Sequence, residues 1–80
     1  MARYIVINSH RPEQCEGMEA DADHLPAALK GADFYCTCPF GEHAYYMFLE
    51  GGSSEEVLSL LPPSFRDGKT RAVPYDVWKL

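Results

Sequence analysis

The chain has 80 residues, which predicts a single domain with a small core, and its 46% hydrophobic and 24% charged residues are typical of globular proteins. The formal net charge is −5 and the seven Lys and Arg residues are scattered, which disfavours nucleic acid and anionic membranes as partners. Five Tyr, four Phe and one Trp favour a packed interior and argue against disorder.

The cysteines and the hydropathy indicate the compartment. No apolar run approaches the ~18 residues that span a bilayer, and the start of the sequence, MARYIVINSH, has no signal-peptide pattern. Three cysteines is an odd number, which suits free thiols. Cys36 and Cys38, about 6.6 Å apart if they lie on one strand, stand at the outer limit for a disulfide. We therefore expect a cytoplasmic protein with reduced cysteines.

The first half of the chain predicts a strand and then a helix. Residues 3–9, RYIVINS, are apolar and β-branched and predict a strand. A helix is expected near 12–23, and Pro26 separates it from a short helical turn near 26–29. The spacing of the apolar residues gives this segment one apolar face, made by Cys15, Met18, Ala22, Leu25 and Leu29.

The second half predicts a hairpin, a helix and a last strand. Strands are expected over 32–38 and 43–50, on either side of the turn PFGE. A capping box in GGSSEE starts the next helix, and the double proline after it ends that helix. Residues 71–80 predict the fourth strand, in which Pro74 indicates an edge position or a bulge.

The predicted order of elements is β-α-β-β-α-β, which is the ferredoxin-like pattern. We therefore expect an α+β fold in which residues 1–80 form a single ferredoxin-like domain, a four-stranded antiparallel sheet with two helices on one face. The other face of the sheet then needs a cover from elsewhere.

Alternation along the strands sorts the side chains between the two faces. In the hairpin, Cys38 lies opposite His43 and Cys36 opposite Tyr45, so all four share a face. Because one set of first-strand side chains contains the polar Asn8 and His10, we assign the other set, with Ile5 and Ile7, to the helices. The helix-packed core is then expected from Ile5, Ile7, Tyr46, Phe48, Val73, Tyr75 and Val77. The helix-free face is expected to carry Asn8, His10, Cys36, Cys38, His43, Tyr45, Met47, Asp76 and Trp78.

With this order of elements and this size, the chain resembles the dimeric α/β-barrel superfamily of ferredoxin-like proteins. The resemblance covers the whole chain and carries no motif of one family. It implies a homodimer that pairs its helix-free sheet faces, with a ligand or active site between them. Members of the superfamily include cofactor-free monooxygenases, haem-degrading enzymes, lactone isomerases and small stress-related proteins, so the fold alone does not choose a function.

A metal site is one interpretation of the polar side chains on the helix-free face. Cys36, Cys38, His43 and His10 offer thiolate and imidazole ligands, which suit zinc, copper or iron. The spacing C-x-C-x4-H is not that of a standard zinc finger. The alternative is that both cysteines are small apolar fillers, since free Cys is among the most buried residue types.

Catalysis is a second interpretation, with His10, His43 and Cys38 as the candidate catalytic residues. Cys38 would be a nucleophile activated by His43, with Asp76 as an orienting carboxylate. Alternatively the histidines would move a proton on an apolar substrate. The candidate substrate-binding residues are Asn8, Cys36, Tyr45, Met47 and Trp78.

Taken together, these patterns favour binding, with or without conversion, of a small molecule in a Cys/His-lined pocket on the helix-free sheet face of a homodimer. A transition-metal-binding protein that uses the Cys/His cluster is one alternative. A non-enzymatic interaction module, whose sheet face is only a dimer interface, is the other. Cys15, on the apolar helix face, and His24, in an acidic stretch, are interpreted as structural.

Overall fold

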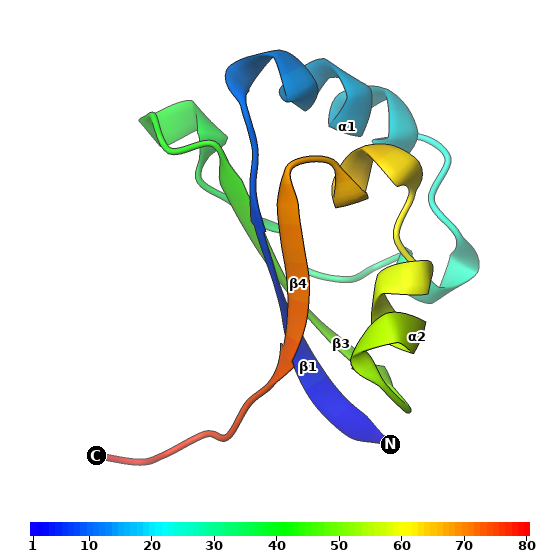
Figure 1. The fold of residues 1–80 in the computed structure, drawn as a ribbon, viewed down its shortest axis with the longest axis vertical. Helices are drawn as coiled ribbons and strands as arrows, with labels where there is room; N and C mark the ends of the chain where they lie inside the picture. The colour runs from blue at the N-terminus through cyan, green and yellow to red at the C-terminus, as the bar shows by residue number, and fades with distance from the viewer.

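The computed structural model describes all 80 residues, with helices and strands in the order β-α-β-β-α-β (Figure 1). The elements are β1 (Ala2–Ser9), α1 (Cys15–Ala22), β2 (Tyr35–Cys36), β3 (Ala44–Gly51), α2 (Ser54–Ser59) and β4 (Lys69–Pro74). Short 3-10 turns lie at Pro12–Gln14, Ala27–Leu29, Cys38–Phe40 and Pro63–Arg66. The predicted order of elements is confirmed.

The four strands form one antiparallel sheet in the order β2-β3-β1-β4, so β1 and β3 are central. Both helices pack on the same face of this sheet, because Met18 of α1 and Val57 of α2 belong to one buried cluster with Val6 and Met47. In Figure 1, α1 lies near the end of the sheet where β1 ends, and α2 nearer the end where β1 begins. The chain is therefore an α+β domain with a four-stranded antiparallel sheet and two helices.

The face that the helices cover is the opposite of the predicted one. Val6 and Asn8 of β1 are buried beneath the helices, whereas Ile5 and Ile7 lie on the helix-free face and are half-buried. The prediction was wrong because it treated Asn8 and His10 as too polar for the core. Their buried side-chain atoms all have hydrogen-bond partners within the chain, and burial of a polar group is tolerated when its hydrogen bonds are made.

The grouping of side chains by alternation nevertheless holds, since partners across the strands still share a face. Ile5 pairs with Phe48 and Val73, and Ile7 pairs with Tyr46. These side chains, expected beneath the helices, instead lie on the uncovered face of the sheet. Tyr75 joins them there through an edge-on contact with the ring of Phe48.

The hairpin has the predicted register but a shorter first strand. Cys36 pairs with Tyr45, as expected. The chain then leaves the sheet, because the turn Cys38–Phe40 takes a 3-10 conformation. Gly41 ends that turn with φ +98°, a backbone conformation that glycine adopts without steric cost.

The last strand begins and ends earlier than the predicted 71–80. Pro74 is its final residue, which fits the absence of a backbone N–H, and β4 is an edge strand as Pro74 indicated. Asp76, Val77 and Trp78 follow in a segment outside the sheet, where Trp78 is 80% exposed. Val77 is therefore not a core residue, and neither Asp76 nor Trp78 belongs to a sheet face.

The helical segments agree with the sequence patterns. The Ser53 side chain accepts a hydrogen bond from the Glu56 N–H at 3.1 Å and so caps α2. Met18 and Leu29 are buried on the apolar face predicted for the first helical region. With 8 and 6 residues, α1 and α2 are too short to be stable alone and depend on packing. Neither has the length and hydropathy that a membrane-crossing segment needs.

Candidate metal centre

Two chain connections meet at one end of the sheet and bring four ligand-type side chains together. The connection from β1 to α1 supplies His10 and Cys15, and the connection from β2 to β3 supplies Cys38 and His43. The central strands hold these connections side by side: the last residues of the β1–β3 ladder pair, and the His10 N–H donates to the His43 carbonyl at 2.9 Å. We call these four residues the Cys2His2 cluster.

The ligand atoms of the Cys2His2 cluster all lie within 4.8 Å of one another. Cys15 Sγ is 3.3 Å from His10 Nε2 and 3.3 Å from His43 Nδ1. Cys38 Sγ is 3.3 Å from the same His10 Nε2, and the two sulfurs are 3.8 Å apart. One nitrogen of each imidazole and both thiols therefore point at a common centre.

Four of these separations are close to the edge lengths of a metal-centred tetrahedron. Zinc binds sulfur at ~2.3 Å and imidazole nitrogen at ~2.0–2.1 Å, which gives tetrahedral edges of about 3.3 Å between nitrogens, about 3.5 Å between a nitrogen and a sulfur and about 3.8 Å between sulfurs. The distance between the two sulfurs, 3.8 Å, equals the last value. The three nitrogen–sulfur distances, 3.3 Å each, are slightly shorter than the nitrogen–sulfur edge.

Burial favours the neutral form of one imidazole in the cluster, that of His10. His10 is 9% exposed, and the other three members of the cluster are half-buried. Burial, followed by the neighbouring charge of His43, lowers the pKa of His10. A lowered pKa favours the neutral ring, and a metal ligand must be neutral imidazole.

The side chain of Asn8 is hydrogen-bonded to the imidazole ring of His10. It is fully buried, and its Oδ1 lies 2.6 Å from His10 Nδ1, on the opposite side of the ring from the thiols. Its Nδ2 donates to the Asp67 carbonyl at 2.9 Å and to Thr70 Oγ1 at 2.8 Å. The segment before β4 is thus tied to the ring that faces the cluster.

Gly68 allows that segment to approach. Its φ is +75°, and a Cβ built on it would lie 2.4 Å from the Ser9 carbonyl oxygen and 3.1 Å from His10 Cα. Only a residue without a side chain fits between the backbone of β1 and this turn. The position of Gly68 therefore fixes how closely Asp67 can come to Asn8.

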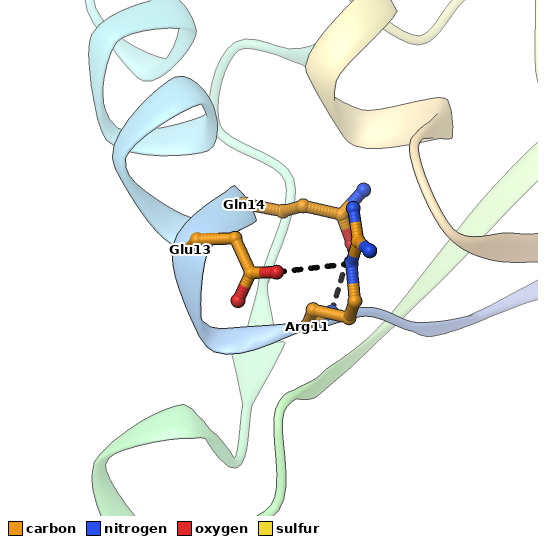
Figure 2. Close-up of polar contacts among 3 residues, drawn as sticks. All are labelled: Arg11, Glu13 and Gln14. Carbon is orange, nitrogen blue, oxygen red and sulfur yellow. Dashed lines mark hydrogen bonds and ion pairs between the residues drawn. The ribbon is translucent and has the colours of Figure 1, made fainter.

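The turn between His10 and Cys15 is braced by its own side chains (Figure 2). The Arg11 N–H donates to Gln14 Oε1 at 2.8 Å, and Arg11 Nε lies 3.1 Å from Glu13 Oε1. Both members of this ion pair are more than half exposed, so it contributes little energy. The turn leads directly into α1 and sets the separation of His10 and Cys15.

A mostly apolar cavity of about 310 Å³ adjoins the cluster between α1 and the sheet. Eleven of its 13 lining residues are hydrophobic, and Cys15 and Cys38 are part of its wall. Cys36 also lines it. Although Cys36 as a whole residue is exposed, partial burial raises the pKa of its thiol. Glu19 is the single charged residue of the lining. Because the rest of the wall is almost entirely hydrophobic, the cavity suits an apolar occupant.

The structure brings together His10, Cys38 and His43, three of the four residues considered as metal ligands from the sequence. The fourth place in the cluster is taken by Cys15, and Cys36 lies outside it. Cys15 was not predicted as a ligand, because its helical spacing also fits a position in the apolar core. The signal that points to it is a mirrored spacing, His10-x4-Cys15 and Cys38-x4-His43. His24 is exposed and lies outside the cluster.

The candidate substrate-binding residues lie in four different surroundings. Asn8 contacts His10, while Cys36 and Met47 line the cavity. Tyr45 is fully buried, its hydroxyl donates to the Phe65 carbonyl, and burial raises its pKa. Trp78 is in the exposed tail.

The location of the site also corrects the sequence interpretation. Asn8, Cys36, Tyr45 and Met47 lie on the helix-covered face of the sheet, not on the helix-free face, because β1 buries the polar set of its side chains. Asp76, the proposed orienting carboxylate, is exposed beyond the end of β4. A pocket on the helix-free face built from these residues is therefore ruled out.

Comparisons with protein-family models, curated proteins and solved structures found no match to this chain.

Proposed function

We propose that this chain is a transition-metal-binding protein and that His10, Cys15, Cys38 and His43 hold one Zn²⁺ ion. The observation that carries this proposal is the convergence of the four ligand atoms within 4.8 Å of one another, with four of their separations, 3.3–3.8 Å, near the edge lengths of a zinc-centred tetrahedron.

The donor set favours zinc among the metals considered. Two thiolates and two imidazoles in a tetrahedron are a common structural zinc site. Copper(II) prefers a square-planar or tetragonal arrangement, and magnesium and calcium prefer oxygen ligands. Iron in the same geometry is the competitor that a metal analysis of the protein distinguishes.

A structural role follows from the completeness of the ligand set. A catalytic zinc keeps one position open for water or substrate, whereas here four protein side chains fill the tetrahedron. The ion would link the start of α1 to the hairpin turn at Cys38. Both are weakly held elements, since α1 buries only Met18 and β2 has 2 residues.

The test is a metal titration followed by unfolding. Protein refolded with a chelator and then given Zn²⁺ should bind one equivalent and unfold at a higher temperature than the metal-free protein, because binding to the folded state alone stabilises it. Cys38→Ser should lose the response, and Cys36→Ser, the matched control two residues away, should keep it. A Zn²⁺ response that survives Cys38→Ser would contradict the assignment.

Binding of a small apolar molecule is a second candidate function, favoured by the cavity. Its volume of about 310 Å³ is at the lower end for ligand pockets, so a compound of one ring or two fused rings is the appropriate size. Indole should shift the methyl NMR signals of Met18 and Met47, and Ala22→Phe, which places a ring in the cavity wall, should abolish those shifts. Unchanged methyl signals at millimolar indole would contradict this function.

We further propose that the domain is ferredoxin-like and that two copies pair through their helix-free faces. The order of elements and the strand order β2-β3-β1-β4 support the first part. The uncovered face supports the second, because it carries the half-buried Ile5 and Ile7 beside the 47% exposed Phe48. Apolar surface of this kind commonly marks an interface.

A further inference from the structure

The side chain of Asn8 has only one orientation that agrees with its surroundings. The Asp67 carbonyl, 2.9 Å away, accepts hydrogen bonds and cannot donate them, so the Asn8 atom facing it is the amide nitrogen. The same nitrogen gives its second hydrogen to Thr70 Oγ1. If the amide were flipped, its oxygen would be pressed against the Asp67 oxygen. The oxygen of Asn8 therefore faces His10.

This orientation determines where His10 carries its proton. An amide oxygen only accepts, so the His10 Nδ1 that lies 2.6 Å from it must be the donor. A neutral imidazole with hydrogen on Nδ1 has its lone pair on Nε2. That nitrogen is 3.3 Å from both Cys15 Sγ and Cys38 Sγ and faces the centre of the cluster. In the metal-free protein the same lone pair accepts a thiol hydrogen.

We infer that Asn8 is a positioning residue that holds His10 in the Nδ1–H tautomer, with the Nε2 lone pair aimed at the metal position. The inference rests on the proposed Zn²⁺ site. Asn8 is suited to this task because it lies on a central strand, paired with Tyr45 on one side and Thr70 on the other. Both amide hydrogens and the amide oxygen of its side chain are hydrogen-bonded, which leaves the amide no freedom to turn.

Outer hydrogen bonds of this kind commonly change metal affinity. The partner that accepts from the far nitrogen of a ligating histidine fixes the tautomer and the ring orientation, and its loss costs ~10- to 100-fold in affinity. Asn8→Leu keeps the number and branching of the side-chain heavy atoms but removes both the acceptor and the donors. Asn8→Asp removes the donors to Asp67 and Thr70 but keeps an oxygen opposite His10 Nδ1.

The affinity test compares three variants by competition for Zn²⁺ with a chromophoric chelator. Asn8→Leu should bind about 10- to 100-fold more weakly than wild type. Asn8→Asp should be destabilised similarly but bind at least about tenfold more tightly than Asn8→Leu. Thr70→Val, the matched control, loses one bond to Asn8 without touching His10 and should keep wild-type affinity. Equal affinities of Asn8→Leu and wild type would overturn the inference, as would equal losses in all three variants.

A second measurement does not depend on metal binding. Nitrogen-15 NMR of the metal-free protein, at a pH where His10 is neutral, reports which ring nitrogen carries the hydrogen. Nδ1–H is expected in wild type and in Asn8→Asp. A protonated Nε2 in wild type would overturn the inference even if Zn²⁺ binds. Conversely, Nδ1–H in a protein that binds no Zn²⁺ would sustain the tautomer assignment and refute the proposed metal site.

Discussion

Cys15 Sγ and Cys38 Sγ lie 3.8 Å apart, although 23 residues separate them in the chain. One thiol stands at the start of α1 and the other in the turn between β2 and β3. No disulfide links any part of the chain, since all three cysteines are free. A metal ion between these thiols would link the first helix directly to the hairpin.

Replacing Cys15 should remove a ligand that sequence spacing alone assigned to the apolar core. Cys15→Ser should weaken Zn²⁺ binding by more than the ~10- to 100-fold expected for losing an outer partner of a ligand. The sulfur-to-metal charge-transfer absorption of the Co²⁺-substituted protein should also decrease. Cys36→Ser, which alters a cysteine outside the cluster, should change neither quantity. If Cys36→Ser had the larger effect, the ligand set would be wrong.

Gly68→Ala should disturb the site through the backbone. The new Cβ would meet the Ser9 carbonyl oxygen and force the β1 backbone beside His10 to move, so both stability and Zn²⁺ affinity should fall. Gly31→Ala is the matched control, since Gly31 also has a positive φ, +82°, but nothing within 4 Å of the added Cβ. It should cost only the backbone strain, about 1–3 kcal/mol in the free energy of unfolding. Equal Zn²⁺ affinities for the two variants would contradict the close-approach role of Gly68.

Tyr45 should make the fold sensitive to alkaline pH. Burial raises the pKa of its hydroxyl, so the folded state keeps a proton that the unfolded state releases near the ordinary value of about 10. The resulting stability is complete below pH ~10 and is lost as the pH rises above it. Urea unfolding across this range should show a decline that Tyr45→Phe reduces. That variant should also lose about 1 kcal/mol at neutral pH, because Tyr45 donates to the Phe65 carbonyl. The same alkaline decline in both proteins would place its origin elsewhere.

The proposed pairing of helix-free faces predicts a concentration-dependent dimer. Phe48→Lys, in the middle of that face, should give a monomer by size-exclusion chromatography with light scattering, because a lysine cannot be buried unpaired at an interface. Phe40→Lys is the matched control: Phe40 is 86% exposed in the hairpin turn and outside the face. Wild-type protein that stays monomeric at high micromolar concentration would contradict the pairing.

The sequence was sufficient for the order of elements and for the hairpin register, because apolar alternation and turn residues are local signals. Cys36 opposite Tyr45 followed from counting residues across the turn. The same counting grouped Asn8, Tyr45 and Met47 on one face correctly. It failed in deciding which face the helices cover, and in placing Asp76 and Trp78 on a strand that ends at Pro74. That decision depended on long-range bonds from Asn8 to Asp67 and Thr70, which lie about 60 residues away along the chain and leave no local pattern.

For the same reason, only part of the candidate site could be predicted from the sequence. His10, Cys38 and His43 are polar or reactive residues within or beside predicted strands, and this pattern predicted them as site residues. Cys15 occupied a position that an apolar helix face also explains, and helix and sheet had been placed on separate sides of the site. In the structure the side chains of β1 face the opposite sides of the sheet from those predicted. The helix α1 therefore lies over the cluster, and Cys15 is one of its members.

X-ray absorption spectroscopy of the zinc-loaded protein would identify the atoms bound to the metal. We expect one Zn²⁺ per chain, with two sulfur neighbours at ~2.3 Å and two imidazole nitrogens at ~2.0–2.1 Å. A first shell of oxygen and nitrogen without sulfur, or a protein that retains no zinc after removal of the free ion, would contradict it.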